Sequence, residues 1–282
     1  MIKICQQSLC ICGFIGSLFF AAMVSANQPN IVLFNVDDLG WSDLGYSGSR
    51  FYESPNVDSL AAEGVIFNNA YACAPNCAPS RACLMSGMYS ARHGIYTVAN
   101  ADRGKNSDRK LIPVNNRTVL ADDIVTLPEQ LQMAGYRTGH FGKWHLGDNY
   151  PYRPQDRGFQ ETIHHGAWGI TSMVDFWSND YYDDTYSHNG QYESYPGYCT
   201  DVWFDEAMKW MKKQKDQDKP FFIYIPTNVP HVPLIVNDNY LDAYKDKVPL
   251  NVAAFYGMIS QCDENLGRLE LFLEQNELKE NT

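Results

Sequence analysis

The sequence predicts an α/β protein with a largely parallel central sheet and helices on both of its faces. Two observations lead to this fold class. Short, nearly continuous apolar runs are typical of strands buried on both faces, and segments with helical periodicity separate these runs. The alternation continues along the chain without a visible internal repeat or low-complexity linker.

The chain of 282 residues opens with what we interpret as a secretory signal over 1–26. It has one lysine, an apolar run and the small residues Ser25 and Ala26 before the expected cleavage point. The run is short for a membrane span, so we expect an exported protein. It would be periplasmic or secreted, or lysosomal or extracellular in a eukaryotic host. Residues 27–282 then form the folded domain, and roughly 250 residues suffice for one large core.

The first expected unit is a strand, a helix and a second strand. The apolar run over 31–36 reads as a strand buried on both faces, and it ends in Asp37 and Asp38. A helix then starts at Ser54-Pro55 and stops at Gly64, because proline suits a first helical turn and glycine a helix end. The apolar run over 65–67 is expected as the next strand.

Two further units repeat this order. In "TLPEQLQMAGYRTGHFGKWHLG", a helix over 127–134 stops at Gly135 and a strand over 136–142 follows. In "CTDVWFDEAMKWMKKQKDQDKPFFIYIP", a helix over 201–215 precedes a strand over 221–225. Parallel strands with intervening helices follow from this repetition.

Two later segments depart from the regular alternation. Residues 164–198 are long, aromatic and without periodicity, which favours an insertion over the site. Residues 251–278 read as a long amphipathic helix. Its apolar face carries Leu266, Leu269, Phe272 and Leu273. The sequence stops at Thr282, where the alternation calls for another strand, so we expect a sheet that is incomplete at its C-terminal end.

Asp37 and Asp38 are the first candidate site residues. They sit at the carboxyl end of a buried strand, where sites form in open α/β sheets. Adjacent carboxylates repel unless a cation lies between them, and oxygen-only ligands suit calcium or magnesium better than zinc. The alternative is an ordinary Asp-rich turn, which the pair alone does not exclude.

The stretch "NCAPSRACLMSG" predicts a short helix that begins near Cys77, since Pro79 suits its first turn and Gly87 the position past its end. Free N–H groups at the helix start favour an anion there, and Arg81 lies one turn on, on the same face. Five cysteines remain after removal of the signal: Cys73, Cys77, Cys83, Cys199 and Cys262. The odd number favours one cysteine with a role other than pairing, although a disulfide from Cys77 to Cys73 or Cys83 stays open.

Two more strand ends carry cationic or titratable groups. Lys143 and His145 are two residues apart at the end of the strand over 136–142, which would point them to one side and Trp144 to the other. His231 follows the strand over 221–225 within "PHVP". A lone histidine is more often structural than catalytic. Three successive strand ends that each deliver Asp, Lys or His instead predict one shared site at one edge of the sheet.

These motifs resemble those of the type I, formylglycine-dependent sulfatases, the arylsulfatase-like family. "CAPSRACLMSG" is similar to the family signature Cys-x-Pro-Ser-Arg followed by Thr-Gly, here Ser86-Gly87, and "GYRTGHFGKWH" matches the second signature. The resemblance implies an alkaline-phosphatase-like αβα sandwich and a sulfatase catalytic domain over 27–282. It covers the amino-terminal part of such enzymes, because the family's later Asp-Asn or Asp-His pair and second lysine do not occur here.

The resemblance also implies a covalent modification and a metal. A formylglycine-generating enzyme would oxidise Cys77 to formylglycine (3-oxoalanine), and Arg81 would steady the modified side chain. Calcium, with magnesium as the alternative, would be bound by Asp37, Asp38 and the modified Cys77. One hydroxyl of the hydrated aldehyde would attack sulfur, and loss of the second hydroxyl's proton would then expel sulfate.

The remaining roles follow from the same resemblance. His145 is expected as the base, Lys143 and His231 as the groups that hold sulfate oxygens, and His231 as the donor to the leaving alcohol. A sulfated carbohydrate or aryl sulfate is the expected substrate. The alternatives are a phosphodiester or phosphonate hydrolase with the same nucleophile, and an inactive remnant that acts only as a binding module. The net charge of −11 argues against nucleic acid and membrane partners.

Overall fold

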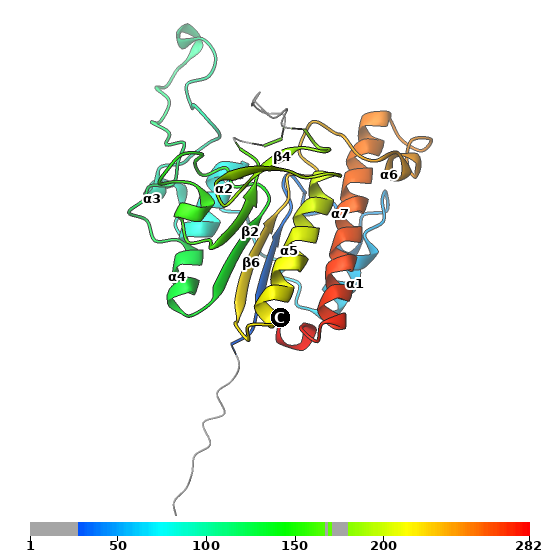
Figure 1. Ribbon diagram of the computed structural model, residues 1–282. Coiled ribbons are helices and arrows are strands. Elements are labelled where there is room, and N and C mark those ends of the chain that lie inside the picture. The colour runs from blue at the N-terminus through cyan, green and yellow to red at the C-terminus, as the bar shows by residue number, and fades with distance from the viewer. Residues whose placement is uncertain (1–27, 167–168, 171–179) are drawn as a thin grey trace, which may run out of the picture.

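The computed structural model describes residues 28–166, 169–170 and 180–282. The expected signal over 1–26 lies outside these residues, as do 167–168 and 171–179 of the stretch over 164–198. The described part forms a sheet between two layers of helices (Figure 1). The strands are β1 (Ile31–Asn35), β2 (Arg137–Phe141), β3 (Glu161–His164), β4 (Thr185–His188), β5 (Gln191–Ser194) and β6 (Phe221–Pro226). The helices are α1 (Pro55–Glu63), α2 (Cys77–Ser86), α3 (Ser90–His93), α4 (Leu127–Met133), α5 (Cys199–Lys215), α6 (Asp238–Asp242) and α7 (Leu250–Gln275).

The sheet has six strands in the order β1-β6-β2-β3-β4-β5. The first four in this order are parallel, with Leu33 opposite Tyr224 and Gly139 opposite Ile223. Strand β4 is antiparallel to β3, and β5 is antiparallel to β4. The predicted fold class, an αβα sandwich with a largely parallel sheet, is therefore confirmed.

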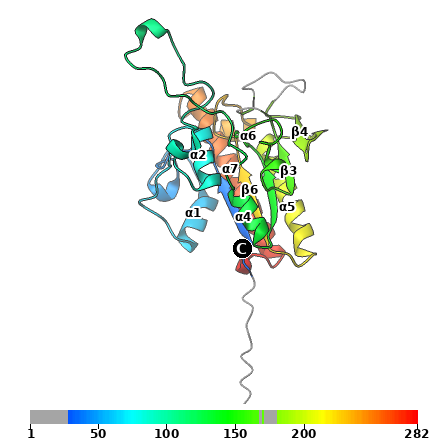
Figure 2. The same cartoon turned by 90° about the vertical axis from the view of Figure 1, so that its left-hand side faces the viewer.

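Helices cover both faces of the sheet, as Figure 2 shows from the side. Alternate residues of β6 point to opposite faces. Ile223 and Ile225 pack in the core beneath α5 and α7, whereas Phe222 and Tyr224 pack in the core beneath α2 and α4. The apolar face of α7 is the predicted one, since Leu266, Leu269 and Leu273 are buried.

Two predicted helix ends are confirmed, and a third helix has a cap that the sequence analysis did not predict. Gly64 follows α1, and Gly87 follows α2 with a φ of 66°, in the left-handed region that glycine favours. Thr126 and Glu129 form a capping box at the start of α4, in which each side chain accepts from the other residue's backbone N–H.

Three expectations about the strands were wrong. The first strand, β1, is half-buried along its length, because it has a neighbour on one side only among the described residues. The segment 65–67 is not a strand but an exposed loop, with Val65 and Phe67 at 79% and 77% exposure. Within 164–198, residues of β4 and β5 extend the sheet beyond β3, so the described part of this stretch is not an irregular insertion.

No helix among the described residues is long and apolar enough to cross a membrane.

Candidate active site

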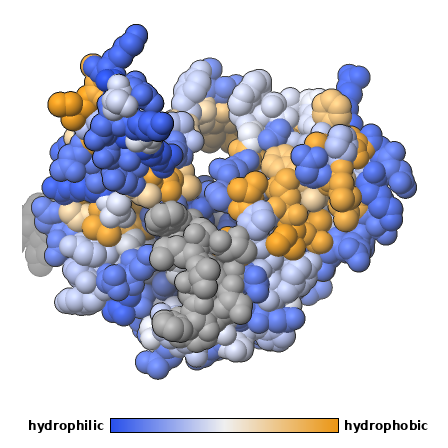
Figure 3. Space-filling view, turned by 90° about the horizontal axis from the view of Figure 1, so that it is seen from above, coloured by the Kyte–Doolittle hydropathy of each residue, from blue (hydrophilic) through white to orange (hydrophobic). Residues whose placement is uncertain are grey.

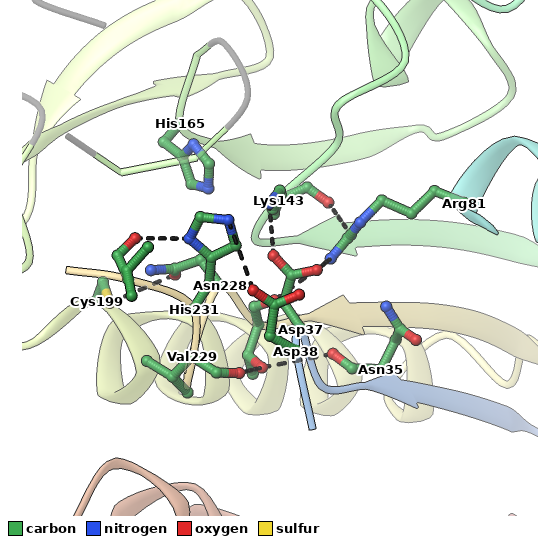
Figure 4. A network of polar contacts seen from close by, with 12 residues as sticks. Asn35, Asp37, Asp38, Arg81, Lys143, His165, Cys199, Asn228, Val229 and His231 are labelled. Carbon is green, nitrogen blue, oxygen red and sulfur yellow. Dashed lines mark hydrogen bonds and ion pairs between the residues drawn. The ribbon is translucent and has the colours of Figure 1, made fainter. Parts of the chain in front are cut away.

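The predicted meeting of strand ends is confirmed in the fold. The strands β1, β6 and β2 are neighbours and parallel, so the segments that follow their carboxyl ends lie at one edge of the sheet. Seen from above, this end of the molecule is hollowed near its centre, and hydrophilic residues gather around much of the rim (Figure 3). Figure 4 shows the residues that these segments bring together.

Asp37 is the central carboxylate of the cluster. Its Oδ2 lies 2.5 Å from Lys143 Nζ and its Oδ1 lies 3.3 Å from Arg81 Nη2, and all three side chains are buried. Burial by itself raises the pKa of a carboxyl group, but the Arg81 and Lys143 cations outweigh it and lower the pKa of Asp37 to about 2. Asp37 is therefore ionised at neutral pH and compensates two buried cations.

Arg81 links α2 to the ends of β2 and β6. Its Nη1 donates to the backbone oxygen of Lys143 at 2.8 Å and lies 3.4 Å from the Tyr224 hydroxyl. Burial by itself lowers the pKa of Arg81, but Tyr224, Asp37 and Cys77 together raise it by more. The pKa of Arg81 is therefore above its usual value, and the guanidinium stays charged. Its Nε is buried and has no hydrogen-bond partner among the described residues.

Cys77 is the first residue of α2 and is half-buried. Pro79 and Arg81 follow within the first helical turns, as the sequence predicts. Cys77 and Arg81 are four residues apart on α2, about one helical turn, so they lie on the same face of the helix. The five cysteines in the described part of the chain are free, so Cys77 has no disulfide partner there.

Lys143 and His145 follow the end of β2, as expected, but their side chains do not follow the alternation of a strand. The strand ends at Phe141, and His145 has a φ of 64°, which breaks the simple alternation of strand side chains. Trp144 between them is buried among the rings of His140 and Phe159.

His145 is 6% exposed and its Nδ1 has no partner among the described residues. Burial first, and then the Lys143 and Arg81 cations, lower the pKa of His145 to about 2. Its imidazole is therefore neutral at physiological pH and retains a lone pair that can take a proton.

His231 faces Asp38 across the site (Figure 4). Its Nδ1 lies 2.6 Å from the backbone oxygen of Val232, so this nitrogen carries the hydrogen. Its Nε2 lies 3.7 Å from Asp38 Oδ2. Asp38 itself is exposed and has a φ of 62°.

The donor set fits a hard cation in kind but supplies only part of a coordination shell. Asp37 and Asp38 offer carboxylate oxygens, the ligands that calcium and magnesium prefer, whereas calcium takes about 6–8 oxygens. Within 28–166, 169–170 and 180–282, no group of three or more His, Cys, Asp or Glu side chains is placed to hold a metal ion. The metal role of Asp37, Asp38 and Cys77 stays a prediction.

His165 was missed in the sequence. It follows β3, is 3% exposed, and its ring points toward His231 and Lys143 (Figure 4). The available signal was the pair His164-His165 after "GFQETI", which reads as the end of a strand once β3 is recognised. It was overlooked because it lies at the start of the aromatic stretch interpreted as an insertion.

Comparisons with known proteins show which family the chain matches. Residues 29–282 match the protein family described as Sulfatase. The chain is 30% identical over 267 residues to the N-acetylgalactosamine-6-sulfatase of Canis lupus familiaris, covering 90% of this chain and 48% of the relative. It is 32% identical over 299 residues to a protein from Formosa agariphila named Sulfatase, covering 88% of this chain and 54% of the relative.

A solved structure shares the fold. The crystal structure of Ps i-CgsB in complex with k-i-k-neocarrahexaose matches with a TM-score of 0.78 and 29% identity, covering 90% of this chain and 57% of that chain. The present chain spans about half the length of the curated relatives it matches.

Proposed function

Because this chain belongs to the sulfatase family, we propose that it hydrolyses sulfate esters of carbohydrates with a nucleophile derived from Cys77. Calcium and formylglycine are part of the proposal, as is a formylglycine-generating enzyme that acts on the "CAPSR" segment during export. The names of its relatives support the substrate class, since one is an N-acetylgalactosamine-6-sulfatase and another was solved with a neocarrahexaose.

One observation carries the proposal. Arg81, on the helix that begins at Cys77, and Lys143 are buried around the same carboxylate, in a chain with a net charge of −11. Two buried cations matched by one buried carboxylate leave local positive charge, which favours a bound anion. The N-terminus of α2 adds N–H groups that favour an anion at the same place.

The prosthetic groups and the chain's own residues contribute differently. Formylglycine would supply a hydrated aldehyde as nucleophile, and calcium held by Asp37 and Asp38 would make its hydroxyl more acidic. Lys143 binds sulfate oxygens and opposes the negative charge that builds up in the transition state. Arg81 holds the side chain at position 77 through its unpartnered Nε.

Two histidines would handle protons. His145 is the proposed base, because its buried Nδ1 has no partner among the described residues and can accept a proton from the nucleophile. His231 carries its first hydrogen on Nδ1, so a second proton on Nε2 lies toward Asp38 and can pass to the leaving alcohol. The base and the acid therefore come from different strand ends, β2 and β6.

The main alternative is hydrolysis of phosphodiesters or phosphonates at the same site, and a further one is a binding module without turnover. Assays of 4-nitrophenyl sulfate, bis(4-nitrophenyl) phosphate and a panel of sulfated monosaccharides separate these functions. We expect turnover of sulfate esters that is abolished in Cys77→Ser and retained in Cys73→Ser, because Cys73 is exposed. Faster hydrolysis of the phosphodiester would replace the proposal, and no turnover of either ester would favour the binding module.

A further inference from the structure

His165 is a buried, titratable side chain of the candidate site that the proposed mechanism does not use. It is 3% exposed, and its ring points toward His231 and Lys143 (Figure 4). The ring lies against Trp203, with centroids 6.2 Å apart. The indole N–H of Trp203 already bonds to Asn228 Oδ1 at 3.4 Å, so it is not available to His165.

The hydrogen on this imidazole is located by the hydrogen bond of Nδ1. Nδ1 lies 2.9 Å from the backbone oxygen of Gly166. A carbonyl only accepts, so Nδ1 carries the hydrogen and Nε2 presents a lone pair. That Nε2 is buried and has no partner among the described residues.

The surroundings keep this ring neutral. Burial first lowers the pKa of His165, the bond to Gly166 opposes it, and Lys143, His164 and Arg81 lower it further, to about 3. At physiological pH the site therefore contains a fixed hydrogen-bond acceptor beside its cations. A lone pair repels sulfate oxygens, which are also acceptors, so a substrate group that bonds to Nε2 has to be a donor outside the sulfate.

We propose that His165 is a specificity-determining residue whose Nε2 accepts a hydrogen bond from a free hydroxyl group of the sugar that carries the sulfate ester. This inference rests on the proposed function and narrows its substrate class to hydroxyl-bearing sulfate esters. An aryl sulfate without a hydroxyl would bind without this contact.

The matched variants follow from the geometry of the two ring nitrogens. His165→Asn keeps an N–H near the Nδ1 position and removes the acceptor in the site, whereas His165→Gln keeps an amide group near the Nε2 position. His164→Asn is the control, because His164 is also buried, with its Nδ1 3.1 Å from the backbone oxygen of His165, and has no role in the proposed mechanism.

The test measures binding separately from turnover. In a Cys77→Ser background, calorimetry gives the Kd of sulfated galactose, N-acetylgalactosamine and glucosamine, and then of the monodeoxy analogues of the tightest binder. We expect one deoxy analogue to bind about 10-fold more weakly, the scale of one lost hydrogen bond. His165→Asn should abolish that difference while leaving the Kd of this analogue unchanged, and His165→Gln should restore part of it.

The other outcomes overturn the inference. If His165→Asn weakens every ligand equally, the residue positions Lys143 or supports the fold. If His165→Asn keeps the difference in Kd between the parent sugar and its deoxy analogues, or if no sulfated sugar binds, His165 does not accept a hydrogen bond from a sugar hydroxyl. Hydrolysis assays with unsubstituted Cys77 are a separate measurement, so binding without turnover contradicts the proposed function but not the inference.

Discussion

The guanidinium of Arg81 lies 3.3 Å from the carboxylate of Asp37 in a buried position. Arg81 belongs to α2, four residues after Cys77, whereas Asp37 follows β1. This ion pair therefore connects the helix that begins with the candidate nucleophile to the sheet edge that carries the candidate metal ligands. Removing one partner of a buried pair leaves an uncompensated charge and costs about 3–5 kcal/mol. The placement of Cys77 relative to Asp37 depends on that pair.

Conversion of Cys77 to formylglycine is directly measurable. We expect the tryptic peptide that ends at Arg81 to be about 18 Da lighter than the thiol form when the protein is exported with a formylglycine-generating enzyme, as replacement of a thiol by an aldehyde requires. Cys73 is exposed and lies in the same peptide, so its alkylation provides an internal control. A disulfide at Cys77 in the exported protein would exclude the assignment.

Lys143 should be essential to turnover. Replacing it with alanine removes one of the two cations on Asp37 and the proposed donor to sulfate. We expect Lys143→Ala to lower kcat for sulfate esters about 100-fold or more, the scale for loss of one preorganised charge-stabilising donor. Lys209→Ala is the control, since Lys209 is exposed on α5 and pairs with Glu206. Near-normal kcat in a folded Lys143→Ala protein would remove this lysine from the mechanism.

His231 should matter most for poor leaving groups. A sugar alkoxide needs a proton as it leaves, whereas 4-nitrophenolate needs little assistance. We expect His231→Ala to lower turnover of a sulfated sugar about 100-fold and of 4-nitrophenyl sulfate by clearly less. His188→Ala is the matched control, because this histidine pairs with Glu161 and Glu193. Equal losses on both substrates would argue for sulfate binding alone and against proton donation.

Buried histidines should make the protein sensitive to acid. Burial lowers the pKa of His140 well below 6.5 and that of His164 to about 4. Their folded-state pKa values are depressed, so the stability they contribute is complete above pH 6.5 and is lost as the pH falls toward the folded values. The free energy of unfolding should decline by up to about 1.4 kcal/mol per pH unit for each histidine. Urea unfolding between pH 7.5 and 5 measures this decline.

Variants of His164 and His188 should change the pH dependence of stability in opposite directions. His164→Gln removes one titrating group, so the free energy of unfolding should fall less steeply as the pH falls, by up to about 1.4 kcal/mol per pH unit. His188 is the contrast: burial lowers its pKa, but hydrogen bonds to Glu193 and Glu161 raise it overall. The stability that protonated His188 contributes is complete below pH 6.5 and is lost as the pH rises through its folded-state pKa. His188→Gln should therefore destabilise the protein at pH 5.5 more than at pH 8.5, and an unchanged slope in both variants would contradict this assignment.

Asp263 connects two helices that are distant in sequence. Its carboxylate, on α7, accepts from the backbone N–H groups of Asn56 and Val57 in the first turn of α1 at 3.1 Å and 2.8 Å. These N–H groups have no partner within their own helix. We expect Asp263→Ala to lower the free energy of unfolding by about 1–3 kcal/mol in urea titrations. Glu264→Ala, at the exposed neighbouring position, should change it by much less.

The sequence by itself determined the strand–helix units and the separate site motifs. Helix ends at Gly64 and Gly87 and the strand over 221–225 follow from local rules, because glycine conformation and side-chain periodicity act within a few residues. The motifs at Asp37-Asp38, Cys77–Arg81 and Lys143–His145 were visible for the same reason. Their meeting was predictable because parallel neighbours end at one edge of a sheet.

Only the tertiary structure decided what depends on contacts between distant segments. Pairing of β4 with β3 and of β5 with β4 decides that part of the aromatic stretch joins the sheet, and no local pattern specifies that pairing. The apolar run over 65–67 has the composition of a strand, yet it has no partner strand among the described residues and remains a loop. His165 is a histidine like any other in the sequence; burial and the nearby Lys143 make it a neutral acceptor, because protonation depends on the charges that folding brings close.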